Sequence, residues 1–407
     1  MRVLIVALLS VAEALERVLA QAAALPAEEA PLAEACGRVL AADLKALRTQ
    51  PPADVSAMDG YAVRSADVAN VPGHLHVIGE VAAGRPFARA VGPGEAARIF
   101  TGGVMPAGAD TIVIQEHTRR NGKEVEVEKP AVSGRHIRTQ GLDFKAGETL
   151  LSAGHRLSAR DLALAAAMNH ARVPVHRRPK IAVFSTGDEL VPPGTEPAPG
   201  QIVSSNTFAL AALARVEGAQ VADLGIIRDQ LDATVAAVRR ARELGVDILL
   251  TSGGASVGDY DLVQKALTAE GITLSFWKLA LRPGRPLMHG RLGAMHVLGV
   301  PGNPVSAFVC GLLFLVPLIR RLAGRSDLAP KAETALLGSD LPENDERADY
   351  LRAMLKQSPD GDVATAFPIQ DSSMMARLAK ADCLLVREPF APPAKAGSRC
   401  SIIKLED

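Results

Sequence analysis

Five acidic residues stand in loops that come shortly after apolar runs. Asp188 and Glu189 come after KIAVFSTG, Asp229 after LGII, and Asp259 and Asp261 after DILLTSGG. Carboxylate oxygens are ligands that Mg²⁺ prefers, and Mg²⁺ neutralises charge on phosphate oxygens during transfer at phosphorus. A turn or capping role explains any one of these loops, but their number favours a magnesium site for a phosphorylated ligand.

Glycine-rich loops could hold that phosphate through their backbone. Glycine lets the backbone approach a ligand closely, and N–H groups at a helix start attract phosphate. Asn303 as N-cap and Pro304 at the first helical position predict such a helix start. The residues predicted to form the phosphate cradle are Ser252, Gly253, Gly254, Pro301, Gly302, Asn303 and Pro304.

Three cations are gathered in one short turn. Lys278, Arg282 and Arg285 belong to the segment WKLALRPGRP, in which Pro286 and other Pro and Gly residues restrict the backbone. Cations held in fixed positions suit an oxyanion or a phosphate group. Three cations on a solvated loop are the simpler interpretation, and the sequence pattern alone leaves both open.

A second kind of chemistry is compatible with the same region. Ser256 lies in GASVG, the spelling of a hydrolase nucleophile elbow, and His289 and His296 follow as candidate bases. The elbow requires a tight strand-to-helix turn, whereas GGASVGDYD contains a second glycine and several acids. A serine hydrolase is therefore the alternative rather than the preferred interpretation.

The elements that must position these loops form a repeating pattern from residue 180. Apolar runs alternate with helical patterns of 12 to 16 residues, which indicates a mostly parallel sheet covered on both faces. Ligands bind beyond the carboxyl ends of such strands. The expected strands are 180–187, 219–227, 247–254, 273–280 and 294–302, and the expected helices are 206–218, 230–245, 259–271 and 305–319.

The rest of the chain has a different texture on each side. Helical periodicity over 11–23, continued over 31–44, predicts a helical first 50 residues. Short alternating runs with glycine turns predict a β-rich part over 51–138, and 139–178 contains one helix over 158–169 and a linker. After 325, short strands predict a β-barrel or sandwich. We expect four parts: 1–50 with 139–178, 51–138, 179–325 and 326–407.

Composition excludes several classes of protein. The 407 residues contain 45 basic and 45 acidic side chains and only 3% aromatics, so the features of a nucleic-acid binder are missing. The apolar stretch 305–319 is too short to span a membrane and contains Pro317. The four cysteines form no CxxC pair, and the N-terminal apolar run precedes no cleavage site, so a reducing cytoplasm is expected.

Taken together, the motifs resemble the molybdopterin molybdenumtransferases, the family that includes the E domain of gephyrin. The resemblance covers the whole chain: SAMDGYAV at 56–63, FTGG at 100–103, PAGAD at 106–110, QE at 115–116, IR through GLD at 137–143, and the four strand-end loops. Each short motif is weak alone, but their shared order is specific. The resemblance implies a central α/β molybdopterin-binding domain, a β-rich domain, an elongated linker domain and a C-terminal β-barrel.

The resemblance also implies a reaction. Adenylylated molybdopterin and molybdate, with Mg²⁺, would give molybdenum cofactor and AMP in a cytoplasmic homodimer whose cleft is shared by two subunits. A molybdopterin adenylyltransferase would be a further partner. A non-catalytic scaffold role is a second alternative, because the gephyrin E domain also acts in that way.

Site roles follow from the resemblance, residue by residue. Asp188, Asp261 and Asp259 would hold Mg²⁺ or position the attacking oxyanion, and Lys278, Arg282, Arg285 and Pro286 would hold molybdate or phosphate. Asp59, Thr101 and Asp143 would complete the cleft from the second subunit. Further ligand contacts are expected from Glu189, Ser204, Asn206, Asp229, Pro301 to Pro304, Arg347 or Arg352, and Ser372 or Ser373.

The chain departs from the family pattern at several positions. Arginine stands at 282 and 285 where lysine is common, and it lacks the point-like ammonium of lysine. Ser204 stands where Asp is usual, Leu142 where Glu is frequent and Asp382 where Asn is usual. These departures concern individual contacts rather than the reaction.

Overall fold

The computed structural model describes residues 8–253 and 262–405, which form two compact units. The first unit comprises Met1–Glu28, Gly37–Ala41 and Val175–Asp407, and the second comprises Glu29–Cys36 and Ala42–Pro174. The predicted residues Gly254, Ser256, Asp259 and Asp261 lie outside the described residues.

The first unit contains the expected α/β sheet. Its strand order is β16-β13-β17-β21-β20-β18, in which β16, β13, β17 and β21 are parallel and β20 is antiparallel to both of its neighbours. A mostly parallel sheet is thus confirmed. The strands are β13 (Lys180–Thr186), β16 (Gln220–Ile227), β17 (Ile248–Ser252), β18 (Thr273–Lys278), β20 (Pro286–Leu292) and β21 (Met295–Val300), with a side ladder of β14 (Leu190–Val191) and β15 (Ile202–Val203).

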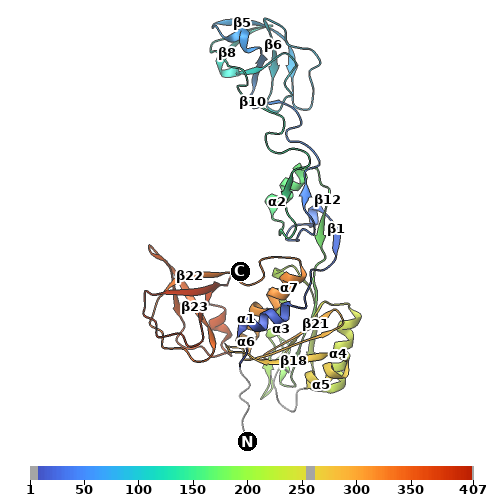
Figure 1. Ribbon diagram of the computed structural model, residues 1–407, viewed down its shortest axis with the longest axis vertical. Helices are drawn as coiled ribbons and strands as arrows, with labels where there is room; N and C mark the ends of the chain where they lie inside the picture. The colour runs from blue at the N-terminus through green and yellow to red at the C-terminus, as the bar shows by residue number, and fades with distance from the viewer. Residues whose placement is uncertain (1–7, 254–261, 406–407) are drawn as a thin grey trace. The chain divides into compact units, whose positions relative to one another are not determined.

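Helices cover both faces of this sheet (Figure 1). On one face, α1, α3, α6 and α7 enclose a core that includes Leu210, Leu250 and Phe314. On the other face, α4 and α5 enclose a second core that includes Phe184 and Val238. The helices are α1 (Val11–Leu19), α3 (Asn206–Val216), α4 (Leu231–Glu243), α5 (Leu262–Ala269), α6 (Pro304–Cys310), the π-helical turn η4 (Gly311–Leu315) and α7 (Val316–Leu322).

The apolar helix is longer than its sequence pattern indicated. Pro304–Leu322 is continuous through the π-helical turn and has the length and composition of a membrane span, but 78% of it is buried inside the fold. It is a core helix, as predicted, because its side chains pack against the sheet and against α1 and α3.

The expected helical first 50 residues are only partly present. α1 begins with a capping box, in which Ser10 and Glu13 bind each other's backbone N–H groups. The continuation expected over 31–44 is wrong. Gly37 adopts a left-handed φ of 74°, and this stretch holds only the single turn η1 (Leu32–Glu34) and the start of β2 (Leu44–Lys45). α1 buries Ala14 and Val18 in the α/β core, so it packs with the first unit.

The C-terminal part is a closed five-stranded barrel. The order β23-β24-β22-β26-β25 closes because β25 also pairs with β23, which confirms the barrel and removes free sheet edges. A two-residue strand from the α/β part, β19 (Leu281–Arg282), joins this sheet alongside β23. The other elements are β22 (Ala332–Leu337), β23 (Ala348–Ser358), β24 (Gly361–Ala366), α8 (Met375–Leu378), β25 (Cys383–Arg387) and β26 (Arg399–Lys404).

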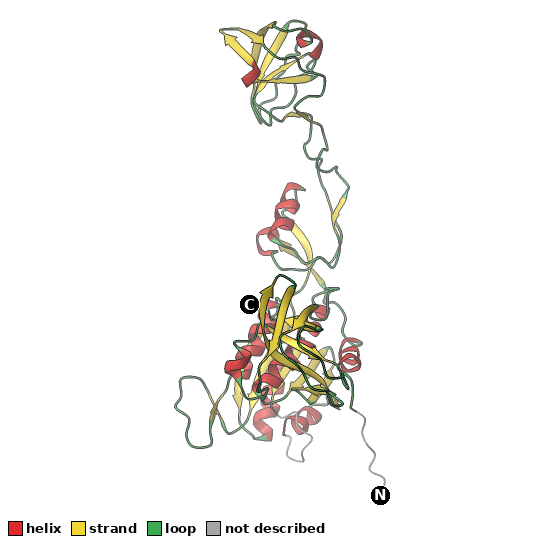
Figure 2. Cartoon of the chain, turned by 90° about the vertical axis from the view of Figure 1, so that its left-hand side faces the viewer, coloured by secondary structure: helices red, strands yellow, loops and turns green. Residues whose placement is uncertain are grey.

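The second unit is mainly β structure (Figure 2). Its main sheet has the order β7-β4-β6-β5-β9-β8, and two small ladders pair β10 with β3 and β11 with β2. The elements not yet named are β1 (Ala27–Pro31), β3 (Val55–Ser56), β4 (Gly60–Val63), η2 (Ser65–Val68), β5 (Gly73–Val81), β6 (Glu95–Ile99), β7 (Thr111–Ile114), η3 (Gln115–His117), β8 (Thr118–Asn121), β9 (Glu124–Val127), β10 (Ile137–Arg138), β11 (Thr149–Leu151), α2 (Ala159–Ala167) and β12 (Arg172–His176).

Candidate active site

A cavity of about 1270 Å³ lies at the carboxyl ends of β13, β17 and β21. This is the sheet edge where the sequence predicted a ligand. Residues of the barrel complete its wall. The predicted site residues that line it are Glu189, Ser204, Asn206, Asp229, Ser252, Gly253, Arg282, Arg285, Pro286, Pro301, Gly302, Asn303, Pro304, Arg347 and Ser372.

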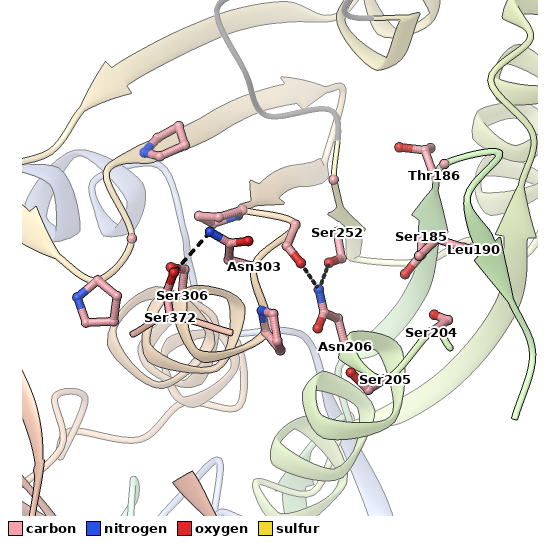
Figure 3. Close-up of a pocket in the computed structure, with 18 of the residues that line it drawn as sticks. Ser185, Thr186, Leu190, Ser204, Ser205, Asn206, Ser252, Asn303, Ser306 and Ser372 are labelled. Carbon is pink, nitrogen blue, oxygen red and sulfur yellow. Dashed lines mark hydrogen bonds between the residues drawn. The ribbon is translucent and has the colours of Figure 1, made fainter. Parts of the chain in front are cut away.

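Asn206, the first residue of α3, ties two strand-end loops together. Its Nδ2 donates hydrogen bonds to Ser252 Oγ at 2.8 Å and to the Gly302 carbonyl oxygen at 2.7 Å (Figure 3). The Gly253 N–H adds a bond to the Val300 carbonyl oxygen. One amide group therefore sets the spacing of the two glycine-containing loops.

Asn303 occupies the predicted N-cap position of α6, and Pro304 follows as the first helical residue. Its side chain does not cap the helix but donates from Nδ2 to Ser372 Oγ at 3.0 Å, and the Val305 N–H donates to the Ser372 carbonyl oxygen. The barrel loop thus takes one of the free N–H groups at this helix start, which makes it less open to phosphate than the sequence indicated.

Small hydroxyl side chains form much of the remaining wall. Several of them were not predicted as ligands, although they stand beside predicted residues in the same loops. Figure 3 shows them coming from β13, the α3 start and α6. The lining residues that the sequence analysis did not select include Ser185, Thr186, Ser205, Ser306, Lys265, Gln370 and Asp371. The hydroxyl groups among them are neutral donors and acceptors, which suit a polar, oxygen-rich ligand.

Of the predicted carboxylates that the structure describes in this domain, two line the cavity and Asp188 does not. Glu189 and Asp229 line it, and Asp188, which is exposed, accepts a hydrogen bond from the Asp229 N–H through Oδ1 at 3.1 Å. Within residues 8–253 and 262–405, no group of three or more His, Cys, Asp or Glu side chains could hold a metal ion.

Arg282 is a paired cation. Its Nε donates to Asp349 Oδ1 at 2.6 Å, its Nη2 also contacts Asp349, and its Nη1 donates to Asp345 at 3.0 Å. The bonds to Asp349 raise the pKa of Arg282 above its ordinary value. Position 284, in the same turn, requires glycine, because its φ is 120° and a Cβ there would lie only 2.7 Å from Cys310 Sγ.

The other two predicted cations of this turn are exposed. Arg285 lines the cavity, whereas Lys278, at the end of β18, is not among the lining residues. Neither side chain forms a salt bridge with any part of the chain that the structure describes. Of the three cations, Arg285 is therefore the one that presents an uncompensated charge to the cavity.

Arg352 lies beneath the cavity wall rather than in it. It is 1% exposed, and its guanidinium donates to Gln370 Oε1 at 3.1 Å and to the Asp371 carbonyl oxygen at 2.9 Å. Burial lowers the pKa of Arg352. Of the paired alternatives, Arg347 and Ser372 line the cavity, whereas Arg352 supports the loop that carries Ser372. Ser373 does not line the cavity, and its N–H and hydroxyl groups both donate to Asp371 Oδ1.

Asp59, Thr101 and Asp143 belong to the second unit. Asp59 Oδ1 accepts hydrogen bonds from the Thr101 N–H at 2.7 Å and the Thr101 hydroxyl at 2.8 Å. The backbone bond from Thr101 is the main cause of a lowered Asp59 pKa, so this carboxylate stays ionised. Asp143 is exposed, and its N–H donates to the Gln50 carbonyl oxygen.

The hydrolase alternative finds no support in the described residues. His289 and His296 are buried in the sheet and are not among the residues that line the cavity. Burial is the main cause that lowers the pKa of each to about 4.

Comparisons with known proteins agree on one family. Residues 9–169 match the family model of the MoeA N-terminal region (domain I and II), residues 182–321 a probable molybdopterin binding domain, and residues 334–405 the MoeA C-terminal region (domain IV). These ranges cover most of the 407 residues.

Relatives and solved structures agree as well. A molybdopterin molybdenumtransferase of Nostoc sp. is 42% identical over 71% of this chain and 67% of its own length. One from Haemophilus influenzae is 34% identical over 91% of this chain and 92% of its own length. The crystal structure of a molybdopterin biosynthesis MoeA protein from Pyrococcus horikosii superposes with a TM-score of 0.85, at 30% identity, over 98% of this chain and all of that chain.

Proposed function

Because the chain belongs to the molybdopterin molybdenumtransferase family, we propose that it inserts molybdate into adenylylated molybdopterin, which releases AMP and forms molybdenum cofactor. The observation that carries the proposal is the cavity at the carboxyl ends of the parallel strands, in the part that matches a probable molybdopterin binding domain. Serine hydrolysis and a purely non-catalytic scaffold have no comparable support.

The two loops that Asn206 joins would hold the phosphorylated ligand. Gly253 and Gly302 bring backbone close to the cavity, and Ser252 adds a hydroxyl group. Such groups bind phosphate oxygens through hydrogen bonds without adding charge. Since the loops are tied at 2.7 and 2.8 Å, they would present their donors at a fixed spacing, which aligns the adenylate phosphorus for attack.

The molybdate oxyanion would lie on the side of the cavity where the barrel meets the α/β sheet. Arg285 and Arg347 supply guanidinium donors there, and Ser306 and Ser372 supply hydroxyl groups. Tetrahedral oxyanions accept hydrogen bonds in several directions, so donors from three different loops suit them. Lys278 would add a cation at the end of β18.

The carboxylates of Asp188 and Asp229 would bind a divalent cation. Mg²⁺ commonly binds proteins through one or two carboxylates and completes its shell with water and substrate phosphate. Asp188 and Asp229, adjacent in space, match that need, and Asp259 or Asp261 would add a further ligand. When bound, Mg²⁺ neutralises charge on phosphate oxygens.

The remaining parts of the proposal concern assembly. We place the protein in the cytoplasm as a homodimer, in which Asp59, Thr101 and Asp143 of a second subunit complete the cleft. The ionised Asp59 would then position a donor group of the ligand. A molybdopterin adenylyltransferase is the proposed source of the substrate, because it makes the adenylylated pterin.

The test is release of AMP by the purified chain with adenylylated molybdopterin, molybdate and Mg²⁺. The wild type should release AMP only when molybdate is present, and Asp188→Asn should lose most of this activity. Asp340→Asn is the matched control, because Asp340 pairs with Lys395 in the barrel and does not line the cavity. No AMP release from the wild type would refute the proposed function.

A further inference from the structure

Two arginines that line the cavity are paired with carboxylates that do not line it. Arg282, from β19, and Arg347, from the turn before β23, are both lining residues, whereas Asp345 and Asp349 are not. The carboxylates therefore bind the guanidinium groups without lining the cavity themselves. The proposed reaction does not by itself explain why both arginines are paired with carboxylates.

Asp345 bridges the two arginines. It accepts a hydrogen bond at 3.0 Å from Nη1 of Arg282, and bonds from the backbone N–H of Arg347 at 3.0 Å and from Nη2 of Arg347 at 2.7 Å. The bonds from Arg347 are the main cause of a lowered Asp345 pKa, so the bridging group is ionised. One carboxylate thus fixes a cation of the α/β part relative to a cation of the barrel.

Asp349 holds the other side of Arg282. The Asp349 side chain is 8% exposed, and its carboxylate forms a two-pronged pair with Nε and Nη2 of Arg282. The strand register enforces this pair, because Arg282 in β19 lies opposite Asp349 in β23. Bidentate pairs of this kind hold a guanidinium group in one orientation.

Asn344 stiffens the turn that carries these residues. Its Oδ1 accepts from Nη2 of Arg282 at 3.1 Å, and its Nδ2 donates to the carbonyl oxygens of Arg347, Arg387 and Glu388. The turn is held at both ends, so neither arginine can turn freely toward a ligand.

The hydrogen bonds described above determine which N–H donors of Arg282 and Arg347 remain unused. An arginine has five N–H donors. Arg282 uses four of them on Asp349, Asp345 and Asn344, which leaves one on Nη1. Arg347 uses two side-chain donors on Asp345, Nη2 at 2.7 Å and Nε at 3.4 Å, which leaves three. The charges of Arg282 and Arg347 are balanced by those of Asp345 and Asp349, so these two arginines offer directed N–H groups with almost no net charge of their own.

We propose that Asp345 and Asp349 are specificity-determining positioning residues: by neutralising Arg282 and Arg347 and fixing their free N–H groups, they add selection among tetrahedral dianions by hydrogen-bond geometry to the general attraction that Arg285 supplies. The inference rests on the proposed function, since molybdate is the dianion in question. A wall of uncompensated arginines would attract sulfate as strongly as molybdate.

The experiment measures binding of molybdate and of sulfate separately to the full chain by calorimetry, without the pterin. Asp345→Asn keeps the shape of the bridge but removes its charge. The released charge should strengthen the binding of both dianions, by roughly five- to tenfold for sulfate. Molybdate should gain less, because its affinity also depends on the N–H directions that Asp345 fixes, so the preference for molybdate should fall. Asp349→Asn should change the preference in the same direction.

Glu343→Gln is the matched control, because it removes one negative charge from the same segment at an exposed side chain. It should leave the preference unchanged, and an equal effect in this variant would overturn the inference in favour of general electrostatics. If Asp345→Asn unfolds, as its thermal transition would reveal, Asp349→Asn decides the question. An unchanged preference in a folded variant refutes this inference alone, whereas absence of molybdate binding to the wild type refutes the proposed function with it.

Discussion

Replacement of Asn206 by alanine should open the phosphate side of the cavity. The amide group of Asn206 donates to Ser252 Oγ and to the Gly302 carbonyl oxygen, at 2.8 and 2.7 Å. Ser252 is only 2% exposed, so its hydroxyl cannot readily replace the lost partner with water. The substitution therefore removes two bonds and leaves a buried acceptor unpaired.

The size of the effect follows from these contacts. Each hydrogen bond contributes about 1 kcal/mol net, and an unpaired buried group adds a further penalty of about 1 kcal/mol, so local opening should become easier by about 2–3 kcal/mol. This difference corresponds to a roughly 30- to 150-fold larger population of the open loop. The core beneath the sheet, whose packing does not involve Asn206, should be unaffected.

Hydrogen exchange is the direct assay. The Gly253 amide, bonded to the Val300 carbonyl oxygen, should exchange faster by the same factor, whereas amides of β13 should keep their protection. Gln201→Ala, which removes a side-chain bond in a neighbouring exposed turn, is the control and should change neither. Equal exchange of Gly253 in the wild type and in Asn206→Ala would refute the view that this amide group holds the two loops.

Two further predictions concern buried titratable groups. His289 and His296 have a pKa lowered to about 4, mainly by burial, so the folded state disfavours their charged form. The free energy of unfolding should therefore be unaffected by these histidines above pH 6.5 and should fall as the pH drops from 6.5 to 4. In thermal unfolding, His296→Gln should lose less stability over this pH range than the wild type. An equal loss in both proteins would show that His296 does not cause it. Burial also raises the pKa of Cys310 and of Cys383 to about 12, while Cys36 is exposed. Alkylation of the native protein at pH 8, read by mass spectrometry, should modify Cys36 and spare the other two, and early labelling of Cys310 would show that the apolar helix opens.

Local patterns predicted the frame of the site well. The alternation of strands and helices placed Asp229, Ser252 and Gly302 at one sheet edge, and all three line one cavity in the structure. This was achievable because a parallel sheet fixes where its loops emerge, whatever the details of packing. The Asn303 and Pro304 helix start was predicted for a similar reason, since a cap depends on only a few neighbouring residues.

Contacts between distant segments could not be predicted in the same way. The pairing of Arg282 with Asp349 spans 67 residues, and that of Asn303 with Ser372 spans 69. No local spacing marks such partners, so the sequence showed Arg282 as a free cation and Asn303 as a simple cap. The burial of Arg352 was not predicted either, because no alternating pattern of apolar residues marks its strand, β23.

The short strand β19 has a consequence for how this protein could be divided or recombined. Although the chain passes from the α/β part to the barrel near residue 325, Leu281 and Arg282 already extend the barrel sheet from the other side of that boundary. A fragment that ends at residue 325 would lose β23, the partner of β19. A barrel taken from a relative would have to pair with a β19 strand of different sequence. The two parts are thus separate in sequence but share a sheet, so an engineered exchange has to replace both of them together.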